Sequence, residues 1–342
     1  MATTTTAAPL FAPRGQRSAV HHPDSTLHHR AGQGTSRGIR QRVIGRLHMA
    51  THAHRRIILG TLVAAMIPAC AAAQVLRSGE PAHSPGVRRI VGEQLGGSVN
   101  EPGLQNTIEV SWIRPLSRSS HPLLADAHLS AGLVSVTTPS EARLGAWVEY
   151  SPLSILDVRA GVEPTAYFGT FNSLLSFAAY SDPYDRETRN ARDDETSGTG
   201  SRTYVAPALK MKAGPLVARV GAAFERWSSS ATGPLFYEPT RDTLLKVEGD
   251  YLMTLTTVAM YQHDYPTGGL LSGGIIHDMT DVFDAPGNRS QRLGLIGIRE
   301  FGSPVVFLPH LRVTAFVWRY LEDPSKRNQW GAALVVGFRT GQ

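Results

Sequence analysis

The sequence predicts an all-β fold: an antiparallel β-barrel that crosses a membrane with about twelve strands, with ten strands as the alternative. Three observations support this prediction. Apolar and polar residues alternate with a period of two in many runs, which a helix would not produce. Several runs reach the ~9–11 residues that a tilted strand needs to cross a bilayer. Short turns alternate with longer polar loops along the chain.

The alternation is clear in residues 143–150, where one face is apolar and the other mixes small residues with charges. The apolar face carries Leu144, Ala146, Val148 and Tyr150, and the opposite face carries Arg143, Gly145, Trp147 and Glu149. Residues 126–133, 156–163 and 216–225 repeat the pattern. A soluble β-sandwich would produce the same period, but small residues and charges of both signs suit the narrow lumen of a barrel better than a solvated sheet face.

Residues 49–73 predict a secretory signal peptide. Arg55 and Arg56 precede an uncharged apolar run, residues 57–69, and Ala73 is the small residue before a predicted cleavage at Gln74. The run is shorter than the ~20 residues of a membrane-spanning helix. The motif at residues 67–70 resembles a lipoprotein processing box, which leaves lipidation of Cys70 as an alternative.

Residues 1–48 precede this signal, are rich in Thr, Ser, His and Arg, and show no apolar period. We interpret them as a disordered extension or as the product of a start codon assigned too early.

Charge and cysteine content exclude several classes of function. After residue 73 the chain has 25 basic and 27 acidic side chains, so the net charge of +6 comes from the first segment and a nucleic-acid partner is not expected. The single cysteine, Cys70, also lies before the predicted cleavage, which excludes disulfides and cysteine metal sites from the rest of the chain. We expect no metal and no cofactor.

The rest of the chain divides into a predicted periplasmic leader, residues 74–104, and a predicted barrel, residues 105–342. The leader is rich in Gly, Pro and charged residues. Eleven strand-like runs follow it, whereas bacterial single-chain barrels have an even number of strands. A further strand near Val87 to Val99, or a hidden turn within residues 243–263, would give twelve.

The signal peptide, the cysteine-free body, the alternation and the loop asymmetry together resemble a Gram-negative outer-membrane β-barrel protein over about residues 105–340. The resemblance implies an integral protein of the cell outer membrane that contacts outer-membrane lipid and lipopolysaccharide and is inserted by the barrel-assembly machinery. It leaves the oligomeric state open. Many such proteins end on an aromatic residue, whereas this chain ends on Gln342 and Phe338 lies four positions earlier.

The last predicted strand alternates between an apolar face and a face of small residues. Trp330 and Phe338 stand at the two ends of the apolar set, about 26 Å apart along a strand, which suits the two interfaces of an outer-membrane bilayer. The opposite set, Gly331, Ala333, Val335 and Gly337, would leave space inside the lumen.

The predicted lumen face is the candidate functional site, because it carries charges that can pair across strands. Its members are Glu109, His128, Arg143, Glu149, Asp157, Arg159, Glu163, Arg219 and Glu225. They would form either the selectivity lining of a pore for small solutes or a salt-bridged plug in a structural barrel. The sequence leaves both open.

The alternative function is an outer-membrane enzyme that modifies lipid or cleaves protein. Residues 126–128, Asp-Ala-His, together with Asp193 and Asp194, resemble the aspartate–histidine machinery of omptin proteases. Ser272 and His277 would fall on opposite faces of a regular strand and so do not form a hydrolase pair. We therefore expect a protein that is not an enzyme.

Overall fold

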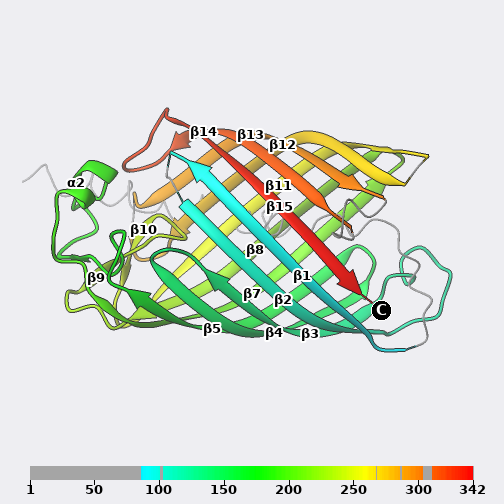
Figure 1. Ribbon diagram of the computed structural model, residues 1–342, viewed down its shortest axis with the longest axis horizontal. Helices are drawn as coiled ribbons and strands as arrows, with labels where there is room; N and C mark the ends of the chain where they lie inside the picture. The colour runs from blue at the N-terminus through cyan, green and yellow to red at the C-terminus, as the bar shows by residue number, and fades with distance from the viewer. Residues whose placement is uncertain (1–85, 101–102, 267, 286, 303–309, 342) are drawn as a thin grey trace, which may run out of the picture. The chain divides into compact units, whose positions relative to one another are not determined.

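The computed structural model describes residues 86–100, 103–266, 268–285, 287–302 and 310–341, and these form a closed antiparallel β-barrel of twelve strands (Figure 1). The strand order around the barrel is β1-β15-β14-β13-β12-β11-β8-β7-β5-β4-β3-β2, and β1 closes it against β15 with Ile90 opposite Gly341. Within the described residues, no helix is long and apolar enough to span a membrane. The predicted fold class is confirmed.

The strands of the barrel are 10 to 17 residues long. Their bounds are β1 Arg88–Val99, β2 Gly103–Pro115, β3 His128–Thr137, β4 Glu141–Leu153, β5 Leu156–Phe168, β7 Ser197–Ala213, β8 Leu216–Ser229, β11 Asp250–Asp264, β12 Gly269–Val282, β13 Arg289–Phe301, β14 Arg312–Glu322 and β15 Trp330–Gly341.

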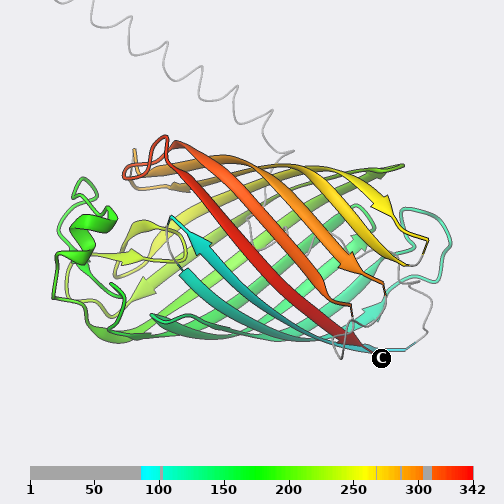
Figure 2. The same cartoon turned by 45° about the horizontal axis from the view of Figure 1, so that its top comes forward.

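The two ends of the barrel differ. The end where β1 begins and β15 finishes, called here the terminal end, has tight turns at residues 154–155 and 214–215. The opposite end, called here the loop end, holds the two longest connections, residues 169–196 and 230–249. Figures 1 and 2 show the short elements gathered at the loop end, opposite the C-terminus.

The long connections at the loop end fold into a small structure of their own. It contains a helix, α2 Arg186–Asn190, and a three-stranded sheet of β6 Ser176–Phe177, β9 Leu235–Glu238 and β10 Thr243–Lys246 in the order β10-β9-β6. Six buried apolar side chains form its core: Leu175, Phe177, Tyr184, Leu235, Tyr237 and Leu244. A second cluster, which includes Phe236 and Leu245, packs against Trp227 and Leu252 of the barrel wall. The loop end therefore carries a packed cap.

Two predicted boundaries differ from those in the structure, and other predictions fall outside the described residues. The leader predicted at residues 74–104 is wrong from Arg88 onward, because β1 and the start of β2 belong to the barrel. The run at residues 243–263 divides into β10 and β11, and the first part joins the cap. The predicted extension (residues 1–48), the signal peptide, its cleavage between Ala73 and Gln74, and Cys70 lie outside the described residues.

Side chains alternate between the two faces of the wall as the sequence predicts. On β4, Leu144 and Val148 are 64% and 55% exposed, whereas Arg143 and Glu149 are buried in the interior. Large apolar side chains are exposed on most other barrel strands, among them Met211, Ile275 and Leu295. An apolar surface of this extent would be costly in water. Glu93 departs from the pattern, because it lies midway along β1 on the outward face, opposite the set that lines the cavity.

Candidate functional site

The lumen holds a cavity of about 580 Å³. Its lining runs from Arg312 and Arg339 near the terminal end to Thr240 and Asp242 near the loop end. This volume lies in the range of ~300–1,000 Å³ that is typical of small-molecule sites. The barrel interior is thus neither a wide water-filled pore nor a fully packed core.

The open space lies against a wall of small residues on β15 and β1. Ala333, Val335 and Gly337 line it from β15, and Gly92 and Gly96 line it from β1. A methyl group added at Gly96 would meet Val335 at 3.3 Å, so even the smallest side chain would press on this wall. The small-residue face that the sequence predicts for the last strand therefore provides room in the lumen.

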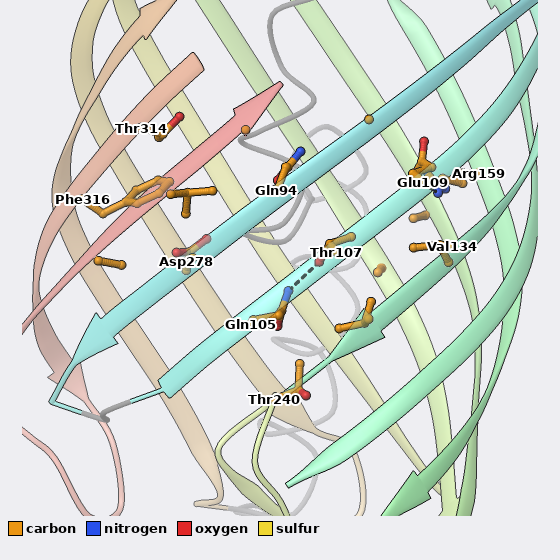
Figure 3. Close-up of a pocket in the computed structure, with 18 of the residues that line it drawn as sticks. Gln94, Gln105, Thr107, Glu109, Val134, Arg159, Thr240, Asp278, Thr314 and Phe316 are labelled. Atoms are coloured by element: carbon orange, nitrogen blue, oxygen red, sulfur yellow. Dashed lines mark hydrogen bonds and ion pairs between the residues drawn. The ribbon is translucent and has the colours of Figure 1, made fainter. Parts of the chain in front are cut away.

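Beside this wall, uncharged polar side chains face the cavity (Figure 3). Gln94 comes from β1, Gln105 and Thr107 come from β2, and Thr314 comes from β14. Gln105 Nε2 donates a hydrogen bond to Thr107 Oγ1 at 3.1 Å. Phe316 adds an aromatic ring to the same region (Figure 3).

The wall formed by β2, β4, β5, β7 and β8 is charged, and its charges are held in pairs. Arg159 forms an ion pair with Glu109 at 2.8 Å and lies over the Trp147 ring at 3.6 Å from its centroid. Arg202 bridges Glu163 at 3.0 Å and Glu225 at 2.8 Å. Because these guanidiniums face carboxylates, their charges largely cancel on this wall.

The remaining wall, formed by β11 to β14, combines apolar and charged parts. Its buried apolar cluster includes Val258, Ile276 and Ile298, with Phe316 packed against it. Arg292 pairs with Asp278 at 3.0 Å, and Arg339 of β15 lies 3.9 Å from Glu300. The lumen therefore has a neutral polar side, a paired-charge side and an apolar side.

The hairpin formed by β9 and β10 sends its tip, residues 239–242, into this lumen. Pro239, Thr240, Arg241 and Asp242 all line the cavity, although they belong to a loop-end connection. Arg241 forms an ion pair with Glu225 at 2.6 Å. Asp242 pairs with Lys326 and lies 3.8 Å from Arg189. The tip is thus attached to β8, to the β14–β15 connection and to α2.

Glu238, at the base of the tip, meets Glu141 of β4 inside the protein. Both carboxyls are buried, and both contact Thr240: its N–H donates to Glu238 at 3.0 Å and its hydroxyl donates to Glu141 at 3.1 Å. The Tyr167 hydroxyl donates to the second Glu238 oxygen at 2.7 Å. Burial, together with the Glu141 carboxylate, raises the pKa of Glu238 to about 7.

Near the terminal end, His128 contacts two interior side chains. Its Nε2 atom lies 3.2 Å from Glu149 and 3.3 Å from the Ser151 hydroxyl. That hydroxyl is buried and donates its proton to Asp157 at 2.7 Å. The Ser151 hydroxyl is thus held between His128 and Asp157 in the barrel interior. Among the described residues, no group of three or more His, Cys, Asp or Glu side chains could hold a metal ion.

The structure brings most of the predicted lumen residues together. Seven line the cavity: Glu109, Arg143, Glu149, Asp157, Arg159, Glu163 and Arg219. Glu225 lies buried beneath the hairpin tip, and His128 lies beside Glu149. Of the predicted interface aromatics, Trp330 is 61% exposed at the loop end of β15, whereas Phe338 is half-buried and also borders the cavity.

Several residues of the site were missed by the sequence prediction. Arg202 and Arg292 lie inside on strands whose alternation could have placed them. Glu238 and Arg241 lie in a long connection without a period, so no sequence signal placed them in the lumen.

No protein-family model matches this chain, and no curated protein matches its sequence. Similar solved structures include the β-domain of the Bordetella autotransporter BrkA, at 12% identity over 74% of this chain and 98% of that chain with a TM-score of 0.39. The translocator domain of autotransporter NalP from Neisseria meningitidis has 12% identity over 85% of this chain and 97% of that one, with a TM-score of 0.39. An outer membrane channel from Pseudomonas putida F1 has 11% identity over 78% and 100%, with a TM-score of 0.33. At these values, none of them indicates what this chain does.

Proposed function

We propose that this chain is an integral outer-membrane protein whose lumen conducts small polar solutes. The observation that carries the proposal is the contrast between the two faces of one wall. The outside exposes large apolar side chains along the strands, and the inside holds a polar cavity that runs along the lumen. A closed barrel satisfies all backbone hydrogen bonds of the wall, which is what a lipid environment demands.

The lumen favours solutes that are uncharged or that carry balanced charges. The side nearest the open space presents amides and hydroxyls, namely Gln94, Gln105, Thr107 and Thr314. Many charges on the other sides are paired, as in Arg159 with Glu109 and Arg292 with Asp278. Such a lining offers hydrogen bonds without a strong field of one sign, so selectivity between anions and cations should be weak.

Two measurements on protein refolded into lipid test the proposal. Single-channel recording should detect a small conductance, and liposome swelling should report entry of small neutral polar solutes. If protein that migrates as a folded barrel shows neither conductance nor solute entry, the proposed conduction is wrong and the barrel has a structural role.

The enzyme alternative has its own test. If the chain is a hydrolase, replacing a histidine by Ala should abolish turnover of lipid or peptide substrates without unfolding the barrel. His128→Ala is the informative variant, because His128 contacts both Glu149 and Ser151.

A further inference from the structure

The contacts of the hairpin tip contain an unbalanced charge at its base. The charged groups linked to the tip and its base by ion pairs or hydrogen bonds are five carboxylates, Glu141, Glu163, Glu225, Glu238 and Asp242, and five cations, Arg143, Arg189, Arg202, Arg241 and Lys326. The totals are equal, but the cations are unevenly placed: Asp242 lies beside Lys326 and Arg189, whereas the two buried carboxyls at the base, Glu141 and Glu238, lie beside Arg143. Burying the extra charge is costly, and a single proton removes that cost.

The excess falls on the pair Glu141 and Glu238. Glu225 is matched by Arg202 and Arg241, and Glu163 by Arg202. The cation nearest the pair is Arg143, 3.4 Å from Glu141. Tyr167 of β5 and Thr240 of the tip are the other polar groups on Glu238, and both donate hydrogen bonds to it. One oxygen of Glu141 is buried without a hydrogen-bond partner, so this carboxyl is incompletely satisfied in the inserted state.

We propose that Glu238, beside Glu141, forms a proton-operated latch: the hairpin tip, residues 239–242, is held in the lumen while Glu238 is protonated and is released when that proton is lost. Both acids hold the tip through Thr240, so repulsion between two carboxylates acts directly on the tip. The apolar core behind β9 and β10 remains packed, which confines the movement to the tip.

The direction of the pH dependence follows from linkage. Burial and Glu141 raise the pKa of Glu238 from 4.5 to about 7 while the tip is inserted, and departure of the tip exposes Glu238 to water in the lumen, which returns its pKa toward 4.5. The inserted state therefore binds more protons across this interval and is favoured at low pH. Its advantage is complete below about pH 4.5 and is lost as the pH rises through about 7. The ratio of inserted to released tip should therefore fall as the pH rises through this window.

The position of the tip can be measured independently of ion conduction. Pro239→Cys on the tip and Leu144→Cys on the outward face of β4, in a chain with Cys70→Ser, provide two sites for spin labels. Distances between the labels, measured by pulsed electron resonance in refolded protein, should show one population at pH 5 and a second, displaced population at pH 8. An unchanged distribution would overturn the latch.

Two variants separate the latch from a general effect of pH. Glu238→Gln carries a neutral group of the same shape and should keep the tip inserted at pH 8. Tyr167→Phe removes a hydrogen bond that stabilises the carboxylate, so the midpoint of release should move to higher pH. Glu248→Gln, an exposed site in the same connection, should behave as the parent chain. Release that persists in Glu238→Gln would assign the titration to another group and refute the proposal.

The effect on conduction rests on the proposed function, and the two can fail separately. If the tip moves with pH but no current appears at pH 5 or pH 8, the conduit is wrong and the latch stands. If current flows equally at both values and the label distances stay fixed, the conduit stands and the latch is wrong.

Discussion

Arg202 and Glu225 form an ion pair of 2.8 Å inside the barrel, and Glu225 is fully buried. The same carboxylate accepts from Arg241 of the hairpin tip and from the Trp227 indole N–H at 2.7 Å. Glu225 of β8 thus connects Arg202 of β7 to Arg241 of the cap's hairpin tip. Glu225 and Glu163 together balance the charges of Arg202 and Arg241, so this cluster is matched as long as all four groups are present.

Removal of this carboxylate should destabilise the barrel and loosen the tip. Glu225→Gln keeps the shape of the side chain but leaves Arg202 and Arg241 with one carboxylate partner fewer, and we expect a loss of roughly 3 kcal/mol in the free energy of unfolding. Urea unfolding of protein refolded in lipid vesicles measures it. Glu187→Gln on the exposed face of α2 is the matched control and should change little. Equal stability of both variants would show that the buried pair is not required.

A charged side chain on the outward face should destabilise the barrel more, the nearer it lies to the middle of the bilayer. Val148 lies near the middle of β4 and is 55% exposed, so Val148→Arg should cost about 2–4 kcal/mol in lipid and lower the folded fraction. Phe171→Arg makes the same kind of change at an exposed position in the loop-end connection and should be tolerated. Heat-modifiable migration on gels, after refolding into vesicles, reports the folded fraction. If both variants fold equally well, the apolar outward face of the barrel does not face lipid.

Much of the wall could be predicted because alternation is a local property of a strand. Leu144 and Arg143 fall on opposite faces in any regular strand, whatever its neighbours are. The first strand, β1, was harder to identify because residues 88–99 are rich in glycine and place Glu93 on the outward face, which interrupts the apolar set. This strand was suggested because bacterial single-chain barrels have an even number of strands, and not by its composition.

The hairpin tip could not be predicted for a different reason. Arg241 reaches Glu225 only because two long connections pack together over a shared core that includes Leu175 and Leu244. That packing depends on contacts between residues distant in sequence, which leave no period to read. The charged lumen residues were therefore predictable from the strands, whereas the groups that attach the tip to them were not.

The small-residue wall should control conductance. Ala333 faces the cavity and its neighbour Ala332 lies on the outward set of β15. Ala333→Trp places a large ring in the open space and should reduce single-channel conductance by more than about half. Ala332→Trp adds the same ring on the lipid side and should leave conductance unchanged. Equal currents from the two variants would mean that solutes do not pass along this wall.

The pair of Glu109 and Arg159 should set the ion selectivity. Both side chains line the cavity, and their 2.8 Å contact cancels their charges in the parent chain. Glu109→Gln leaves the positive charge of Arg159 facing the lumen, so the channel should become selective for anions. Arg159→Gln leaves the carboxylate and should make it selective for cations.

Reversal potentials under a salt gradient measure this selectivity. The parent chain should give a value near zero, and the two variants should deviate from it in opposite directions. High salt should shrink both deviations, because mobile ions screen the uncompensated charge. Glu248→Gln, which removes an exposed charge from the loop end, should remain at the parent value. Deviations of the same sign in both variants would show that these two groups do not face the conducting path.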